Sequence, residues 1–250
     1  MRMRKRHNLE PRLERCASVI IGSDECHKGQ WHNDFGSYGR VYLELGCGKG
    51  KFTAGTAEAD KGSLIIGLEK VPDAMVIATE RVCAADLDNV RFICDDVQNL
   101  KEMFALGDID RIYINFCDPW PKSRDAKLRL TAPSFLRLYS DILPVGGEIH
   151  FKTDNLPLFN WSEDQFISEG WELSEVTRDL HGNGINGIMT DYEEKFHNMG
   201  TKINRLVARK TAATKDGTAG TPGRLRNASL CDAVGYEESR AANEAGAEAE

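Results

Sequence analysis

The sequence has no long hydrophobic run, no paired-cysteine motif and no surplus of basic residues. No apolar stretch of the 250-residue chain approaches the roughly 20 residues that span a bilayer, and the basic N-terminus lacks the apolar centre of a signal peptide. The seven cysteines are odd in number and form no CxxC pair, which argues against a zinc site and against a disulfide framework. We therefore expect a cytoplasmic protein that holds no metal ion and binds no membrane.

The net charge of −7 conceals two basic segments. Residues 1–15 carry six Lys and Arg against two Glu, and residues 118–137 carry five against two Asp, so their local charges are +4 and +3. Such segments are typical of a site for a polyanion, although a solvated surface is the commoner explanation for charge alone.

The composition divides the chain into three parts. Residues 1–40 are predicted to form a basic arm on the substrate side, and residues 41–210 the main domain. Residues 211–250 are rich in Ala, Gly, Ser, Thr and Glu and have few bulky apolar side chains, so they cannot offset their ordering entropy and are predicted to be disordered.

Strand-like and helix-like segments alternate in the main domain. Apolar runs predict strands at 41–45, 63–69, 89–94, 110–116 and 147–153. Helical patterns cover 52–59, 72–87, 97–106 and 132–143, and two later strands are possible at 170–179 and 202–210. This alternation predicts an α/β fold with a doubly wound, mostly parallel seven-stranded sheet and helices on both faces.

Acidic residues stand at the end of each of the first five strands. They are Glu44, Glu69, Asp95 with Asp96, Asp118 and Asp154. Because parallel strands present their carboxyl ends at one edge of the sheet, these side chains are expected to lie along one rim. Several like charges in one place are costly unless they face a polar, partly cationic ligand.

The glycine-rich turn after the first strand indicates the class of ligand. Gly46, Gly48 and Gly50 follow a GxGxG spacing, whereas a dinucleotide site needs GxGxxG. Glycines allow a ligand to approach the backbone, and the nearby Glu44 would repel a pyrophosphate but attract an ammonium or sulfonium group. S-adenosylmethionine carries both cations. Glu69 is placed to accept from ribose hydroxyls and Asp95 or Asp96 from an adenine amino group, with a helix N-cap as the alternative for Asp95.

Two motifs, DPWPK and TDYEEKF, are far more specific than the glycine turn. LELGCGKGKF with IGLEK resembles the class I S-adenosylmethionine-dependent methyltransferases, whose fold is Rossmann-like. NFCDPWPKSR, IHFKTDN and IMTDYEEKF narrow the resemblance to the bacterial tRNA (guanine-N7-)-methyltransferases of the TrmB type, from about Met1 to Lys210. The resemblance implies methyl transfer to N7 of guanine 46 in the variable loop of tRNA. We expect the protein to be a monomer or a homodimer.

The resemblance also implies roles for individual residues. The cofactor would meet Glu44, Glu69, Asp96 and Asp118, and Asp118 would be catalytic. The tRNA would meet Lys122, Asp154, Thr190, Asp191, Tyr192 and Glu193. We interpret Asp118 as an orienting and electrostatic group, because N7 of guanine carries no proton that a base must remove.

The basic run after DPWPK departs from the family pattern. Asp125 stands where a histidine is usual, and Leu128 where a basic residue is usual, which affects the expected affinity for tRNA more than the chemistry. Arg124, Lys127 and Arg129 are retained, and Lys127 and Arg129 are expected to meet phosphates.

Other interpretations of the same residues stay open. Trp120 could stack on an extruded guanine or pack in the core, and Thr190 with Glu193 could form a helix capping box. The target could be another amino group, on a nucleic acid, a protein or a small molecule. An NAD-dependent oxidoreductase and a binding module without activity are the alternatives from other classes.

Overall fold

The structure is a computed structural model that describes residues 7–22 and 27–217. Within them lies one mixed sheet of eight strands in the order β1-β4-β3-β2-β5-β6-β8-β7. The strands are β1 (Ile20–Ile21), β2 (Arg40–Leu45), β3 (Ser63–Leu68), β4 (Val90–Ile93), β5 (Arg111–Asn115), β6 (Glu148–Thr153), β7 (Glu172–Thr177) and β8 (Asn204–Arg209). The first six strands run parallel, and β8 pairs antiparallel with both β6 and β7.

The predicted fold class is confirmed, with one strand more than expected. All seven predicted strands are present, and β1 is the addition. Two residues of β1 pair with Phe92 and Ile93 at the edge of the sheet. So short a segment has no alternation of apolar and polar residues that the sequence could reveal.

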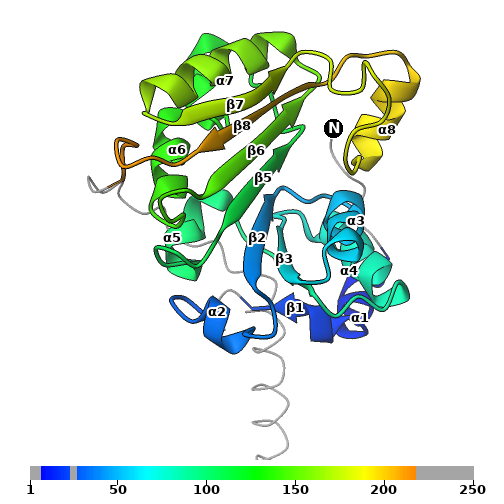
Figure 1. Cartoon of the computed structure of the whole chain (residues 1–250). Coiled ribbons are helices and arrows are strands. Elements are labelled where there is room, and N and C mark those ends of the chain that lie inside the picture. The colour runs from blue at the N-terminus through cyan, green and yellow to red at the C-terminus, as the bar shows by residue number, and fades with distance from the viewer. Residues whose placement is uncertain (1–6, 23–26, 218–250) are drawn as a thin grey trace, which may run out of the picture.

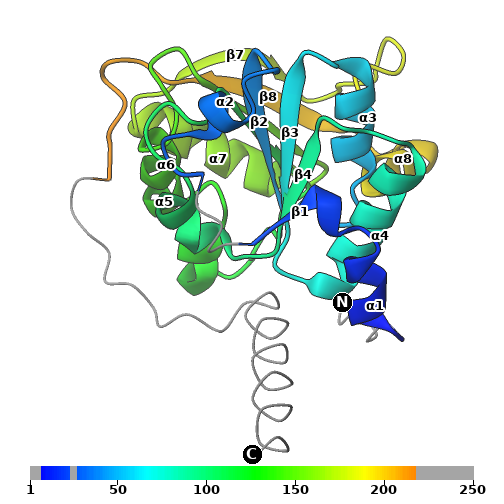
Figure 2. The same ribbon diagram turned by 90° about the horizontal axis from the view of Figure 1, so that it is seen from below.

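Helices cover both faces of the sheet (Figure 1 and Figure 2). The α-helices are α1 (Leu9–Glu14), α2 (Trp31–Asp34), α3 (Lys51–Ala59), α4 (Pro72–Ala84), α5 (Leu100–Met103), α6 (Pro133–Ser140), α7 (Leu156–Ser168) and α8 (Asp191–Asn198). Short 3-10 helices lie at η1 (Ala17–Val19), η2 (Val97–Asn99) and η3 (Ser123–Leu128). In Figure 2, α5, α6 and α7 lie on one side of the strands, and α1, α3, α4 and α8 on the other.

The helix predictions were accurate at three of four places. The predicted helix at 97–106 is instead η2 followed by the single turn of α5, because Phe104 takes an extended backbone. Helix α7 was not predicted, although Asn155 caps it by accepting from the Leu158 N–H and Pro157 lies in its first turn. An Asx cap followed by proline is a start signal that could have revealed it.

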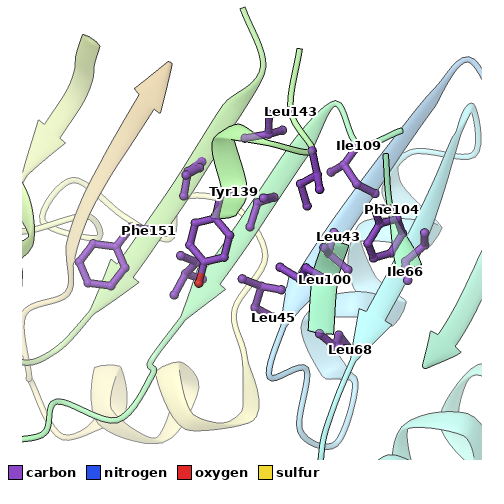
Figure 3. Close-up of a cluster of buried hydrophobic side chains, with 14 of the residues drawn as sticks. Leu43, Leu45, Ile66, Leu68, Leu100, Phe104, Ile109, Tyr139, Leu143 and Phe151 are labelled. Carbon is purple, nitrogen blue, oxygen red and sulfur yellow. The ribbon is translucent and has the colours of Figure 1, made fainter. Parts of the chain in front are cut away.

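The main apolar core lies between the sheet and helices α5, α6 and α7. Figure 3 shows Leu43 and Leu45 of β2 beside Leu100, Phe104 and Tyr139 from the covering segments. The only polar atom of the Tyr139 side chain, its hydroxyl, donates to the Leu130 carbonyl. A second cluster packs α3 and α4 against the opposite face of β2, β3 and β4.

Part of the predicted N-terminal arm belongs to the folded body. The Trp31 side chain is buried against Phe104, and its indole N–H donates to the Met103 carbonyl over 3.0 Å. Arg12 of α1 makes a two-pronged ion pair with Glu80 of α4, both contacts at 2.7 Å. The charge of the arm concealed these packing residues, and residues 1–6 lie outside the described part.

The predicted disordered tail begins too early at residue 211. The Thr211 and Thr214 hydroxyls donate to the Gly170 carbonyl, and Lys215 donates to the carbonyl of Ser168 at the end of α7. Polar contacts of this kind leave no hydrophobic pattern in a sequence. Residues 218–250 of the predicted tail lie outside the described residues. No helix in the described ranges is long and apolar enough to cross a membrane.

Candidate active site

The register of the sheet aligns the ends of four neighbouring strands. Leu45 of β2 pairs with Leu68 of β3 and with Ile114 of β5, and Leu68 pairs with Ile93 of β4. The acidic residues that follow these strands therefore emerge along one rim, as the sequence predicts for Glu69, Asp96 and Asp118.

The three glycines of the turn after β2 have backbone conformations that favour glycine. Gly46, Gly48 and Gly50 all have positive φ angles, of 70°, 57° and 70°. A Cβ atom on Gly46 or Gly48 would meet nothing within 4 Å, whereas one on Gly50 would lie 2.6 Å from the Ala78 Cβ of α4. Because Gly46 and Gly48 have no side chains and face open space, a ligand can approach the backbone there. Gly50 instead permits α3 and α4 to pack closely.

Glu69 connects the glycine turn to the end of β3. One carboxylate oxygen accepts from the Gly48 N–H and the other from the Val71 N–H, each at 2.9 Å. The side chain is half-buried, so it keeps a surface toward solvent. Contacts to backbone N–H groups orient this carboxylate before any ligand arrives.

Glu44 lies beneath the turn and is almost completely buried. Its two oxygens accept from the Thr53 hydroxyl at 2.5 Å and from the Asn115 amide at 3.0 Å. Burial raises the pKa of Glu44 to about 7, and these two hydrogen bonds and the charge of Lys152 oppose that shift. The expected contact between Glu44 and a cofactor stays a prediction, because both oxygens already have partners in the protein.

Asp95 and Asp96 organise the loop after β4. Asp96 caps η2 by accepting from the Gln98 N–H at 3.0 Å, and Asp95 accepts from the Asn99 amide at 2.7 Å. Of the two, Asp96 therefore has the N-cap role that we considered for Asp95. Both side chains remain half-buried at the rim.

Asp118 lies on a loop with an unusual backbone. Phe116 and Trp120, two residues to either side of it, have positive φ angles of 54° and 40°. Such a conformation costs a non-glycine residue about 1–3 kcal/mol and is concentrated at functional sites. Asp118 is exposed, and in the described part of the chain no hydrogen bond engages its carboxylate. Trp120 is also exposed rather than part of the core, which leaves its ring available for stacking.

Arg129 holds the Asp118 loop and has a different environment from the one expected. Its guanidinium donates to the carbonyls of Pro119 and Trp120 at 3.0 Å and lies 4.4 Å from the centre of the Trp161 ring. These contacts occupy the group that we expected to bind phosphate. Lys122 and Lys127 are exposed, and the exposed Arg124 lies 3.7 Å from the unusual Asp125.

Helix α8 begins with the predicted capping box. The Thr190 hydroxyl accepts from the Glu193 N–H at 2.9 Å, and the Glu193 carboxylate accepts from the Thr190 N–H at 3.2 Å. The same carboxylate is fully buried and accepts from Lys152 at 2.6 Å and from His181 at 3.0 Å. The structure gives Glu193 these interior partners, so its contact with a substrate stays a prediction.

Other residues of the predicted substrate set lie at the surface near α8. The Tyr192 hydroxyl donates to Asp154 at 3.5 Å, and the Tyr192 ring lies 5.2 Å from that of Phe116. Asp191 makes an ion pair of 3.3 Å with Arg81 of α4. These contacts bring the ends of β5 and β6 together with α8, as the grouping of these residues in one site requires.

Several residues of this region were missed by the sequence reasoning. Asn115 and Lys152 stand on neighbouring strands at paired positions, and both side chains point to the α3 side of the sheet. Alternation along the strands could have revealed them, since every second residue of 112–115 and of 149–152 is apolar. No cluster of His, Cys, Asp and Glu that could hold a metal ion occurs in the described residues.

Comparisons with known proteins agree with this geometry. Residues 39–206 match a family model described as "Putative methyltransferase". A tRNA (guanine-N(7)-)-methyltransferase of Listeria monocytogenes serotype 4b (strain F2365) is 42% identical over 210 residues, which are 84% of this chain and 98% of that protein. A protein of the same name from Clostridium kluyveri is 39% identical over 210 residues, or 84% and 99% of the two chains.

Solved structures show the same fold at low sequence identity. The 16S rRNA methyltransferase KamB has a TM-score of 0.58 at 15% identity and covers 75% of this chain and 94% of its own. A structure described as an antibiotic-related methyltransferase has a TM-score of 0.55 at 17% identity, with coverage of 75% and 93%. At these identities the likeness concerns the Rossmann-like methyltransferase fold alone.

Proposed function

Because the chain belongs to the family of tRNA (guanine-N(7)-)-methyltransferases, we propose that it transfers a methyl group from S-adenosylmethionine to N7 of a guanine in tRNA. The observation that carries the proposal is the rim formed by the glycine turn, Glu69, Asp96 and Asp118 at the aligned ends of adjacent strands. The alignments with two relatives of this name cover almost the whole length of those proteins, which supports the same reaction.

The rim fits the proposed methyl donor. Gly46 and Gly48 leave open space beside the turn, and Glu69 and Asp96 offer half-exposed carboxylates for hydroxyl and amino groups. Asp118 adds a negative charge at the neighbouring strand. S-adenosylmethionine, when bound, supplies a methyl group that its sulfonium centre already activates. We expect no metal ion to take part.

The protein's contribution to the chemistry is positioning and electrostatics. The lone pair of guanine N7 lies in the plane of the ring and carries no proton, so the site needs no general base. Asp118 can hold the N1–H and amino edge of the base and stabilise the positive charge that develops on the purine. The clamp of Arg129 on the two carbonyls beside Asp118 keeps this carboxylate in place.

The proposed substrate side comprises the loop after β5, η3, the end of β6 and the start of α8. Lys122, Arg124 and Lys127 offer exposed positive charge for phosphates, and Trp120 offers an exposed ring for stacking. Thr190, Asp191, Tyr192 and Asp154 would meet the tRNA as well; Asp191 contacts Arg81 of α4, and Tyr192 contacts Asp154 and the Phe116 ring after β5. We propose guanine 46 of the variable loop as the target, the cytoplasm as the location, and a monomer or homodimer as the active form.

A methyl-transfer assay on unmodified tRNA transcripts tests the proposed function. We expect radioactive methyl incorporation that nucleoside mass spectrometry identifies as 7-methylguanosine, and none when the variable-loop guanine is replaced by adenine. Methylation of the adenine variant to the same extent would contradict the proposed position, and a methylated amino group would favour the alternative target class.

Replacement of the proposed catalytic carboxylate tests the assignment of Asp118. Asp118→Asn should lower kcat by about 10²-fold, as removal of a single electrostatic stabiliser does in other enzymes. Asp164→Asn, which changes an exposed carboxylate on α7, is the control and should retain full activity. Full turnover by Asp118→Asn would exclude the orienting and electrostatic role.

A further inference from the structure

A buried group of three side chains joins β6 to the start of α8. Lys152 of β6 is 6% exposed, Glu193 of α8 is fully buried, and His181, in the loop of residues 178–190 before α8, is 7% exposed. One carboxylate oxygen of Glu193 accepts from Lys152 at 2.6 Å, and the other accepts from His181 at 3.0 Å. Side chains so deeply buried affect a substrate at the surface only through the residues that they hold.

The hydrogen bonds of this group run in one direction. The Asn186 N–H donates to Nδ1 of His181 at 3.1 Å, so that nitrogen carries no hydrogen and Nε2 is the donor to Glu193. The Glu193 oxygen that accepts from Lys152 also accepts from the Thr190 N–H at 3.2 Å. Three donors therefore converge on one carboxylate, whereas a glutamine at this position would present an amide N–H to one of them.

The loop before α8 is attached at a second point by Lys152. The Lys152 ammonium donates to the Ile188 carbonyl at 3.0 Å and lies 5.0 Å from the centre of the Phe52 ring of α3. The Ile188 side chain fits against Gly55 of α3, where an added Cβ atom would lie 2.8 Å from Ile188 Cγ2. Because three glycines give this loop many accessible conformations in isolation, its attachments to β6, α3 and α8 decide its position.

The first turn of α8 links the buried group to the loop of the proposed catalytic residue. Tyr192 directly precedes Glu193; its hydroxyl donates to Asp154 at 3.5 Å, and its ring lies 5.2 Å from the Phe116 ring. Phe116 stands two residues before Asp118 and has a left-handed backbone with a φ angle of 54°. A displacement of Glu193 would therefore move Tyr192 relative to the ends of both β5 and β6.

Stability alone does not account for a buried charged group at this position. Removal of two charges from water is costly, and apolar side chains of similar volume often hold two segments together at least as strongly. Burial lowers the pKa of Lys152, and the charge of Glu193 opposes this shift, so each charge depends on the other. Apolar contacts have no direction, whereas hydrogen bonds that converge on one carboxylate fix its orientation. The charged group therefore orients the segment that carries it.

We propose that Lys152, His181 and Glu193 are positioning residues for the methyl transfer, which hold the start of α8 in the orientation that binds tRNA without contacting the RNA themselves. The inference rests on the proposed function, because tRNA is the substrate that α8 would meet. For Glu193, this role replaces the direct substrate contact that the family resemblance implies. In the described residues no hydrogen bond joins the group to the glycine turn or to Glu69, so binding of the methyl donor should not depend on Glu193.

A matched pair of conservative variants of the full chain tests the proposal. Glu193→Gln leaves one of the three donors without its acceptor, so KM for unmodified tRNA transcripts should rise about 10-fold. Both kcat at saturating tRNA and Kd for S-adenosylhomocysteine should stay close to the wild-type values. Glu169→Gln makes the same change in a buried carboxylate at the end of α7, which pairs with Arg137 at 2.7 Å, so Tm should fall while KM is unchanged.

A double variant separates positioning from stability. Glu193→Ala should raise KM and lower Tm, because Lys152 is left buried without its counter-ion. Adding Lys152→Met should restore most of the loss in Tm, but KM should remain about 5-fold or more above wild type, because the hydrogen bonds that orient α8 are still missing. Recovery of KM together with Tm would show that the group serves stability only and would overturn the inference.

The direction of the hydrogen bonds can be observed without any activity. NMR chemical shifts of the two ring nitrogens of His181 should show the hydrogen on Nε2 in the wild-type protein. In Glu193→Gln, an amide that donates to Nε2 moves the hydrogen to Nδ1, so the Asn186 amide loses its acceptor and should exchange with solvent about 10-fold faster or more. A hydrogen on Nδ1 in the wild type would contradict the arrangement on which the positioning role depends.

The outcomes separate the positioning role from the proposed function. If the wild-type protein is active and Glu193→Gln has the same KM for tRNA, the inference is overturned and the proposed function stands. An equal rise of KM in Glu169→Gln would overturn it as well, since that rise would reflect a general loss of folded structure. If Glu193→Gln fails to fold, Tm and KM of the double variant decide alone. Failure of the wild-type protein to methylate tRNA would refute the proposed function, and the positioning role with it.

Discussion

The two faces of β5 and β6 differ completely, although alternate residues of the same two strands form them. On one face, Ile112, Ile114, Ile149 and Phe151 are fully buried against the helices of the main core. On the other face, Tyr113, Asn115, His150 and Lys152 line a cavity of about 230 Å³ beside α3. The apolar face gains stability from burial, which needs no direction, whereas the polar face depends on individual hydrogen bonds and charges.

The difference between the faces explains where the function lies. A face that only packs tolerates other apolar side chains of similar volume. A face with oriented polar groups can bind a ligand, but each of its members depends on its partner.

Removal of one member of the buried ion pair should have the largest effect on stability. Glu193→Ala leaves Lys152 buried without its counter-ion, so the free energy of unfolding should fall by about 3–5 kcal/mol. Adding Lys152→Met should recover most of this loss, because the unpaired charge is then gone. Urea denaturation of the single and double variants measures both steps.

The apolar face supplies the control for the ion pair. Phe151→Ala should also cost about 3–5 kcal/mol, through the cavity that it leaves. Lys152→Met should not recover this loss, because Phe151 points to the opposite face. Equal recovery in both backgrounds would contradict the distinction between the two faces.

The buried carboxylate of Glu44 should make stability depend on pH. Its pKa of about 7 in the folded state lies above the ordinary value of 4.5, so the folded protein holds a proton that the unfolded chain has lost. Stability should therefore fall as the pH rises from about 4.5 through about 7 and then level off. Glu44→Gln removes this dependence on pH, so its free energy of unfolding relative to wild type should rise by about 2–3 kcal/mol between pH 5 and pH 8.

Thermal or urea unfolding of both proteins across this pH range is the measurement. The Gln side chain can still meet Thr53 and Asn115, which keeps the packing comparable. A difference between the two proteins that is constant with pH would contradict the raised pKa.

Loss of the Arg129 contacts with the Asp118 loop should have the smallest effect on stability and a clear effect on catalysis. Arg129→Gln removes the contacts with the Pro119 and Trp120 carbonyls, so kcat should fall about 10-fold while unfolding changes by about 1 kcal/mol. Arg124→Gln, at an exposed site, should instead raise KM for tRNA in a salt-dependent way. The reverse pattern in steady-state kinetics would show that Arg129 serves the phosphates after all.

Much of the fold could be predicted because the strands are apolar and turn residues separate them from the helices. Runs such as SLIIGLE have too many apolar residues for a surface segment and are bounded by turn residues. The rim could be predicted as well, since parallel strands must end at one edge, and Glu69, Asp96 and Asp118 follow directly from that rule. Family resemblance, rather than pattern, pointed to the α8 segment.

The remaining errors have one physical origin. Trp31, Thr211 and Lys215 are held by contacts with segments that are distant in the sequence. Arg129 is a basic residue of the type that binds phosphate, but in the structure it donates to the carbonyls of the strained Asp118 loop. Charge and periodicity indicate which interactions a residue can make. Neither shows which group the side chain contacts in the folded protein.

The sequence by itself determined the parallel sheet, the left-handed glycine turn and the row of carboxylates, because each depends on local periodicity or on a backbone conformation. Only the tertiary structure decided that Glu44 and Glu193 lie inside with partners of their own, and that, among the described residues, the Thr56 hydroxyl and the Asn115 side-chain oxygen are buried without a hydrogen-bond partner. The physical reason is that burial and hydrogen-bond pairing are properties of packed segments, which a residue acquires only when the chain brings its distant neighbours together.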